Sequence, residues 1–245
     1  MFEDIVTTFR KNTEDVESLI NFDHEVLQVV TLSLEELHKK LKQTYASDQM
    51  NGGRVLEIVK GIRNNETLKS KYTAIFNQAV VLLVSHFSSA LGDIFRAAVE
   101  VWLDREGNTS LLDEDIKLTF REMKERGWNM KTSAAELLIA KKDLTFQDMQ
   151  STVRAFDNYL GVKLDRDKVT NNIIFGQAFR HVIVHSGGSV SERMIKQISK
   201  ATSRTLKPNI TAGEKVFFSN EEVVELKTEM LTYINRVVAS IEAAQ

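Results

Sequence analysis

Two imidazoles and a guanidinium fall close together in residues 179–188, which read Phe-Arg-His-Val-Ile-Val-His-Ser-Gly-Gly. Histidine titrates near neutrality, so His185 could remove the proton of a ribose 2′-hydroxyl or protonate a leaving oxygen. Arg180 carries a permanent charge on a planar fork of donors, which suits the charge that develops on phosphate oxygens. These residues predict RNA cleavage that uses no metal and no cofactor.

The spacing of these residues limits how they can meet. If the segment is helical, His181 and His185 are one turn apart on one face, whereas Arg180 lies about 140° round from His185. One helix therefore does not direct Arg180 and His185 at one spot, but two copies related by a two-fold axis could. We therefore expect a homodimer in which His181 orients the cleft.

Two other interpretations of the same residues remain open. Cations near the end of a helix complement its dipole and cap its last carbonyls, so Arg180, His181 and His185 could have only a structural role. His181 and His185, four residues apart, could also bind zinc. However, no glutamate follows His181 as in the H-E-x-x-H pattern, and no third ligand is evident.

The elements that must position these residues are predicted to be helices. The 245 residues include one proline and eleven glycines, so helix-breaking residues are few. Hydrophobic residues make up 42% of the chain, which is enough for a sizeable core. We predict an all-α helical bundle, with one short β-hairpin expected at most, in residues 206–218. The predicted helices span 13–46, 66–104, 110–126, 145–160, 168–184, 189–202 and 219 to the end of the chain.

Local signals place the ends of several of these helices. Asp167 is a suitable N-cap for the helix that carries Arg180, and Gly187 would end it. Gly161 would end the preceding helix, and Ser219 opens a capping box for the last one. The last helix has an apolar seam at 223, 226, 230, 233 and 237.

The first predicted helix has a separate apolar seam, which could pack within the fold or against a partner chain. The seam consists of Ile20, Leu27, Val30, Leu34, Leu37 and Leu41. A polar, Gly- and Asn-rich stretch at 47–65 then predicts a boundary between an N-terminal helical extension, 1–65, and a helical bundle, 66–245.

Composition narrows the class of protein further. The chain has no cysteine, which excludes disulfides and thiolate chemistry and suits a reducing compartment. The N-terminus lacks the apolar run of a signal peptide, and the longest apolar run is only 79–84. We expect a cytoplasmic protein without a membrane segment. Its net charge is −2, so nucleic acid would have to bind to a local basic patch.

The motif and its context resemble the HEPN family. Arg180, His181 and His185 match the Arg, polar and His positions of the family signature. Residues 79–95, AVVLLVSHFSSALGDIF, look like the long family helix that packs beside the signature helix, although many relatives have Glu in place of Ser88. Segments 145–164 and 213–223 are also similar to larger bacterial members. The resemblance covers about residues 70–245.

This resemblance implies a helical bundle that dimerises and forms a composite cleft from two Arg–His sets. Catalytic HEPN proteins cut RNA to a 2′,3′-cyclic phosphate and a 5′-hydroxyl, and many act as toxins or in phage defence. The implied partners are an RNA substrate, a second copy of the chain and an antitoxin or other regulatory protein. The alternative is a non-catalytic HEPN-like module for binding or dimerisation.

Overall fold

The computed structural model describes residues 1–44, 57–58, 69–104 and 109–244, and this part of the chain is all-α, as predicted. The longer helices are α1 (Phe2–Thr44), α3 (Lys69–Trp102), α8 (Lys168–Ser186) and α10 (Asn220–Ala243). The shorter ones are α4 (Thr109–Leu112), α5 (Phe120–Glu125), α6 (Met130–Lys141), α7 (Met149–Leu160) and α9 (Glu192–Ile198).

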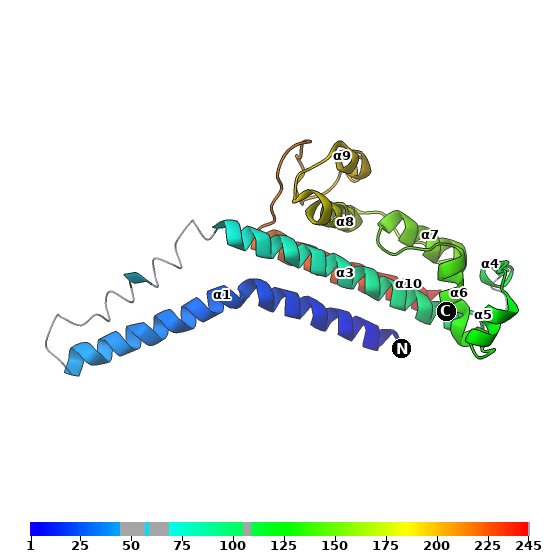
Figure 1. Cartoon of the computed structure of the whole chain (residues 1–245), viewed down its shortest axis with the longest axis horizontal. Coiled ribbons are helices and arrows are strands. Elements are labelled where there is room, and N and C mark those ends of the chain that lie inside the picture. Colours follow the sequence, from blue (N-terminus) through cyan, green and yellow to red (C-terminus); the bar gives the residue numbers. More distant parts are fainter. Residues whose placement is uncertain (45–56, 59–68, 105–108, 245) are drawn as a thin grey trace.

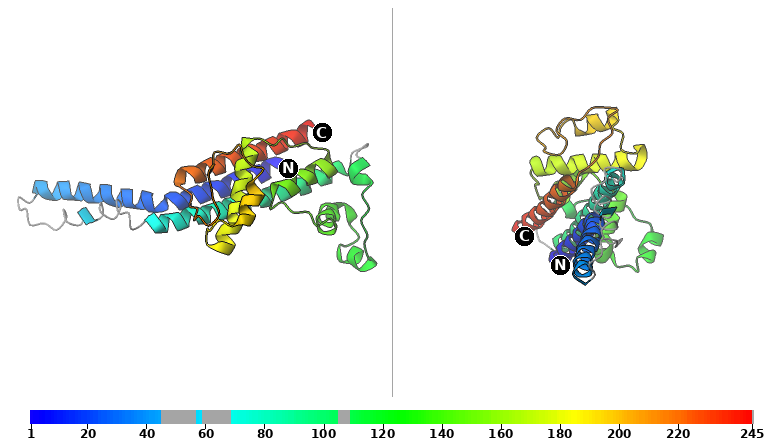
Figure 2. Two further views of the ribbon diagram at one scale, coloured as in Figure 1. Left: turned by 90° about the horizontal axis from the view of Figure 1, so that it is seen from above. Right: turned by 90° about the vertical axis from the view of Figure 1, so that its left-hand side faces the viewer.

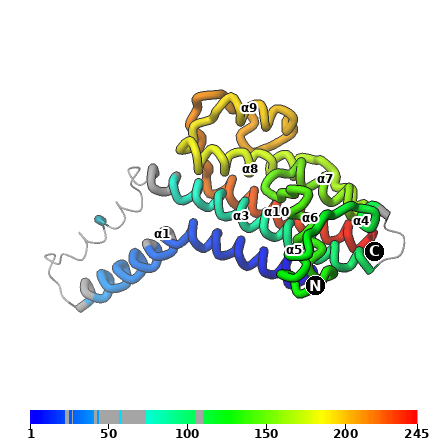
Figure 3. The backbone as a smooth tube through the Cα atoms, turned by 45° about the vertical axis from the view of Figure 1, so that its right-hand side comes forward, coloured from blue at the N-terminus to red at the C-terminus, as the bar shows by residue number. Residues whose placement is uncertain are grey.

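Three long helices, α1, α3 and α10, run side by side along the length of the molecule (Figures 1 and 2). α1 is antiparallel to α3 and α10 is parallel to it, so both chain ends lie at the same end of the bundle (Figure 1). α8 crosses α3 and α10 steeply and carries α9 on its outer side (Figures 1 and 2). The short helices α4, α5 and α6 gather at the end where the termini lie (Figure 3).

The core forms around α3, which is apolar on most sides because other helices surround it. Phe87 of α3 is fully buried and packs between Phe9 of α1 and Tyr233 of α10, with ring centroids 6.1 and 5.9 Å apart. Phe95, about two helical turns further on, packs against Phe156 of α7, with ring centroids 5.5 Å apart. Each fully buried side chain of this size stabilises the fold by about 1.5–3 kcal/mol.

The first half of α1 belongs to this core. Phe2, Phe9, Val16 and Ile20 are buried and fall on one helical face. An ion pair between Glu17 and Lys227 also joins α1 to α10. Residues 2–20 of the predicted N-terminal extension therefore pack into the bundle, and the helix begins eleven residues before the predicted start at 13. The predicted boundary at 47–65 lies outside the described residues, apart from 57–58.

The second half of α1 projects beyond α8 and α10 (Figure 2). Of the predicted seam, Ile20 is buried, but Val30 and Leu37 are 39% and 53% exposed. The side chains of Leu27 and Leu41 lie outside the described part. A neighbouring stripe of α1 is also exposed and apolar, and it consists of Leu19, Phe22, Val26 and Val29. At about 100° per residue these four fall within one third of the helix circumference.

By length and composition, Ala74–Trp102 of α3 could cross a membrane, with a mean hydropathy of 1.5 over its best window. The longest uninterrupted apolar run, 79–84, did not indicate this property, because scattered polar residues interrupt the apolar ones along α3. The observation is weak support for a membrane span, because side chains such as Leu83, Leu91 and Ile94 are fully buried against other helices. The core helix of a soluble protein has the same character.

Segments 110–126 and 206–218 do not form the predicted secondary structure. The helix predicted over 110–126 is two short helices, α4 and α5, and α5 begins at a capping box of Thr119 with Glu122. The hairpin predicted in 206–218 is not formed. In the described ranges this segment makes one isolated antiparallel bridge, Ser189 to Lys215, with Val190 N–H donating to the Glu214 carbonyl at 2.9 Å.

Candidate functional site

The candidate residues lie in the last two turns of α8, whose ends follow the local signals in the sequence. The Asp167 carboxylate accepts a hydrogen bond from the Thr170 N–H at 2.9 Å and caps the start of the helix. Gly187 ends it in the left-handed conformation, with φ 55°. Between these caps α8 is buried on most sides up to Phe179. From there it emerges, so the chemistry-bearing residues follow directly on a rigid, packed segment.

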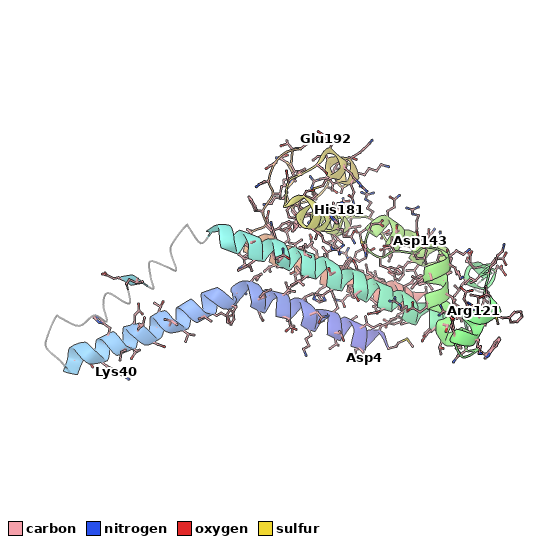
Figure 4. All side chains as sticks on the ribbon, in the orientation of Figure 1. Asp4, Lys40, Arg121, Asp143, His181 and Glu192 are labelled. Carbon is pink, nitrogen blue, oxygen red and sulfur yellow. The ribbon has the colours of Figure 1, made fainter. Side chains whose placement is uncertain are left out.

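The structure brings His181 and His185 together. Their ring centroids are 4.5 Å apart with the planes tilted by 50°, and both side chains are exposed. Neither imidazole makes a hydrogen bond or ion pair with a described residue. Figure 4 labels His181 on α8, which lies between α3 and α9. The pair is therefore open to a ligand.

The His181 ring is biased toward its neutral form. Partial burial lowers the pKa of His181, and the positive charges of His185, Arg193 and Arg180 lower it further. An imidazole with a lowered pKa is a better proton acceptor at neutral pH, because a larger fraction of it is unprotonated. The permanent charges of Arg180 and Arg193 also create a local field that attracts anions.

Arg180 occupies a different environment from the two imidazoles. Its side chain lines a cavity of about 370 Å³ between α8, α3 and the 139–147 segment. Its Nε atom is buried and has no hydrogen-bond partner, and the guanidinium makes no ion pair with any described residue. Since a buried donor without a partner costs about 1–3 kcal/mol, Arg180 is held in a state that an anion would relieve.

The cavity beside Arg180 is polar on the α3 side. Ser88, the position where many HEPN relatives have Glu, lines it, and the Ser88 hydroxyl donates to the Val84 carbonyl at 2.8 Å. A second arginine, Arg96, also lines the cavity, but Asp93 and Glu136 neutralise it at 3.0 and 2.5 Å. Arg180 is therefore the cation with available charge in this cavity.

Arg180 and His185 do not meet within one chain. No hydrogen bond or ion pair joins Arg180 to either imidazole in the described part of the molecule. Arg180 faces the cavity against α3, whereas the imidazoles lie on the exposed side of α8. This separation follows from the helical geometry anticipated in the sequence.

The end of α8 is capped by backbone groups and not by these side chains. The Gly187 and Gly188 N–H groups both donate to the Val182 carbonyl, the second at 3.3 Å, and Ser189 N–H donates to the Ser186 carbonyl at 3.1 Å. Within the described ranges, neither Arg180 nor the two histidines donate to a helix carbonyl. The structural-cap interpretation therefore lacks the contacts that it requires, although the charges still complement the helix dipole.

For the zinc interpretation, a third ligand beside the two histidines is needed. Among the residues that the structure describes, no group of three His, Asp or Glu side chains is placed to hold a metal ion.

A second cavity was missed from the sequence. It has a volume of about 730 Å³, lies between α7, α8 and α9, and has a basic rim that includes Arg154, Arg193, Lys196 and Lys200. The spacing of 193, 196 and 200 places three cations on one side of the chain, and this signal was present in the sequence. The remaining contributors come from distant segments and could be assembled only by the fold.

Comparison of the chain with protein-family models, with curated proteins and with solved structures found no match.

Proposed function

We propose that the chain is a metal-independent, dimeric endoribonuclease of the HEPN type, acting in the cytoplasm. The observation that carries the proposal is the Arg180 guanidinium, half-buried beside a cavity and without a partner, in a helix whose adjacent residues include two free imidazoles. An unpaired guanidinium is costly for folding, and a phosphate group would pair with it through its planar fork of donors.

The proposed reaction uses the ribose 2′-hydroxyl of the substrate as the nucleophile. A neutral imidazole removes its proton, the 2′-oxygen attacks phosphorus, and the bond from phosphorus to the 5′-oxygen breaks. A protonated imidazole delivers a proton to the leaving 5′-oxygen. The products are a 2′,3′-cyclic phosphate and a 5′-hydroxyl.

Each candidate residue has a distinct role in this scheme. His185 acts as general base or acid, and His181, whose pKa is lowered, orients the cleft. Arg180 stabilises the charge that builds on the phosphate oxygens. Because Arg180 and the imidazoles face different sides of α8, the complete site is proposed to combine Arg180 of one copy with His185 of the other.

Replacement of His185 tests the function. His185→Ala should lower the rate of cleavage of a fluorophore-quencher RNA by about 10²–10⁴-fold, the usual contribution of a general acid or base. The His185 side chain is exposed, so the melting temperature of the variant should stay within about 2 °C of that of the wild type.

Val184→Ala is the matched control, because Val184 is the preceding residue and is 56% exposed. The control should cleave at the wild-type rate in the presence of EDTA. Equal cleavage by His185→Ala and the wild type would overturn the proposal.

A non-catalytic interaction module is the second candidate, and the exposed stripe of α1 favours it. Phe22 and Val29 are 61% and 63% exposed, and they lie beside Val26 and Leu19 on a helix that projects from the bundle. Large apolar side chains gathered on one exposed face are typical of protein-binding surfaces. Purified protein that binds a protein partner but cuts no RNA would favour this second function over the first.

A further inference from the structure

The cavity between α7, α8 and α9 has the dimensions of a small-molecule site. Its volume is about 730 Å³, within the range of about 300–1,000 Å³ typical of ligand pockets. Three helices and the 164–166 segment line it, so its walls are packed structure. It is separate from the cavity that Arg180 lines.

One polar side chain at the floor of this cavity has an unused donor. Gln177 is 6% exposed, and its Oε1 atom accepts a hydrogen bond from the Met149 N–H at 3.0 Å. Its Nε2 atom is buried and has no partner in the described structure. The Met149 bond determines the orientation of the amide, because exchanging its two ends would set one donor against another. The last torsion of glutamine is soft, so the amide of this lining residue can adjust its position for a ligand in the cavity.

The walls next to Gln177 are apolar. Met149 is 2% exposed, and Val153, Leu164 and Ile174 are partly buried around it. These side chains form a surface suited to the face of a flat heterocycle. A planar ring that carries a carbonyl oxygen would fill this part of the cavity and accept the Gln177 N–H.

The rim of the cavity is strongly basic. Arg154, Arg193, Lys196 and Lys200 line it, and none of them makes an ion pair with a described residue; Arg154 Nε donates to the Gln150 carbonyl at 3.3 Å. Arg166 lines it as well, but its guanidinium donates to the Asn171 side chain at 3.1 Å and the Lys200 carbonyl at 2.7 Å. The single carboxylate in the lining, Asp148, caps α7 through the Ser151 N–H. In a chain of net charge −2, four unpaired cations at one opening mark an anion site.

We propose that this cavity binds a nucleotide. The base lies against Met149 and Ile174 with a carbonyl oxygen on the Gln177 amide, and the phosphate is held by the lysines and arginines of the rim. Arg193 lines this cavity and also lowers the pKa of His181, so the nucleotide site adjoins the imidazole pair. The bound unit is either a free nucleotide or one residue of an RNA strand.

Isothermal titration of the full chain with uridine 5′-monophosphate tests the proposal. Uracil offers two carbonyl oxygens to Gln177. Uridine without phosphate should bind at least about tenfold more weakly, which is about 1.4 kcal/mol. The double variant Lys196→Gln/Lys200→Gln should bind uridine monophosphate more weakly by a similar factor, and its affinity for uridine should equal that of the wild type. Gln177→Glu retains an oxygen that accepts from the Met149 N–H but removes the side-chain N–H donor, so it should weaken the binding of both ligands.

The matched control is Lys117→Gln/Lys124→Gln, which removes two exposed lysines outside the cavity and should change neither affinity. Absence of binding up to about 1 mM uridine monophosphate, or equal affinity in the Lys196/Lys200 double variant, would overturn the proposal. The rim variant keeps this test decisive even if Gln177→Glu fails to fold. A dissociation constant of about 1 mM corresponds to a binding free energy of about −4 kcal/mol.

Titration of the His185→Ala variant with ten-residue oligouridine separates the two sources of the nucleotide. Tighter binding of the oligomer than of the monophosphate, lost in the Lys196/Lys200 variant, identifies an RNA strand as the occupant. Tighter binding of the monophosphate identifies a free nucleotide. Because binding is measured without cleavage, a failed nuclease proposal and a failed nucleotide site give different results.

Discussion

At the scale of single residues, two of the five buried polar atoms that lack a hydrogen-bond partner in the described structure belong to residues that line the two cavities. Arg180 Nε and Gln177 Nε2 are both buried donors without partners, one in each cavity. The sequence predicted Arg180 because it stands in a short motif with two histidines. It did not predict Gln177, since a lone glutamine in an apolar helix carries no pattern that distinguishes it. Only the fold reveals that its amide is half satisfied.

Arg180→Met separates the effect of this side chain on stability from its proposed role in RNA cleavage. Methionine retains much of the volume but removes the unpaired donor, so the variant should be more stable by about 1 kcal/mol, or roughly 2–4 °C. Cleavage should fall to background, because the phosphate charge is no longer stabilised. Thermal melts and RNA cleavage measured on one preparation check both. A variant that loses stability and retains cleavage would assign Arg180 a structural role.

Glu229 gives the fold a pH dependence. Burial raises the pKa of its carboxyl from 4.5 to about 7, with a smaller contribution from Glu225, while the hydrogen bond from Asn172 opposes the shift. Because the folded state binds this proton more tightly than the unfolded chain, this group's contribution to stability falls as the pH rises from 4.5 to 7. Above that window the charged carboxylate destabilises the fold.

Glu229→Gln should therefore melt a few degrees above the wild type at pH 8, since about 1 kcal/mol corresponds to roughly 2–4 °C in a chain of this size. The glutamine oxygen can still accept the Asn172 hydrogen bond. The difference should disappear toward pH 4.5, where the wild-type carboxyl is neutral in both states. Melting curves across this range check it, and a difference that does not change with pH would contradict the assignment.

At the scale of elements, sequence prediction succeeded where the determinant was local. Asp167, Ser219 and Gly161 cap the helices that they were predicted to cap, because a cap depends on a few neighbouring residues. The last helix buries all five residues of its predicted seam. The single helix predicted over 110–126 was wrong, because this segment does not bury a continuous face: Leu112 and Phe120 are 52% and 80% exposed.

Other elements depended on tertiary packing. Helix α6, Met130–Lys141, was not predicted, since its alanines and leucines have no strong periodicity of their own; its Ala135 and Leu138 are buried in the core. Helix α1 is buried before most of its predicted seam: Ile20 is buried, whereas Val30 and Leu37 are exposed and accessible to a partner chain. Its first half is the part that packs against α3 and α10, and the exposed second half shows that an apolar pattern alone does not identify the buried surface.

Asn172 fixes the loop after α9 to α8, and its removal should be costly. Its side-chain oxygen accepts from the Thr205 and Leu206 N–H groups at 3.0 and 3.1 Å, and its nitrogen donates to Glu229 at 2.7 Å. Asn172→Ala leaves two backbone donors without partners, so we expect a loss of about 2–4 kcal/mol. Urea denaturation measures it, with the exposed Asn235→Ala as control. A loss below about 1 kcal/mol would show that water replaces these bonds.

At the scale of the whole molecule, the sequence predicted the all-α class but not how the copies of the chain complete a site. Arg180 faces a cavity against α3, and the imidazoles face outward, so the proposed cleft needs two chains. The predicted dimer depends on the rotation of about 140° around the helix between Arg180 and His185, and the two side chains face different sides of α8 in the described chain. No contact between copies is present in a single chain, so this remains a prediction.

Mixing two inactive variants tests the shared site. Arg180→Ala and His185→Ala should each be inactive alone. After subunit exchange, half of the dimers are mixed and each contains one complete pair, so about a quarter of the wild-type activity should return if the pair spans two chains. If both groups act within one chain, no activity returns. Size-exclusion chromatography of both variants must first confirm that they dimerise, and recovery of activity is then measured against mixing time.

The placement of the guanidinium and the imidazoles on different sides of α8 carries a consequence for dosage. If the site combines residues of two copies, a single copy is inactive. Because the dimer is then the active species, the rate of RNA cleavage in a dilute population rises with the square of the protein concentration. A cell could tolerate a low basal level without harm, while a modest surge in synthesis would cross a sharp threshold. A partner that binds single copies and prevents dimerisation would then inactivate the protein without binding in the cleft.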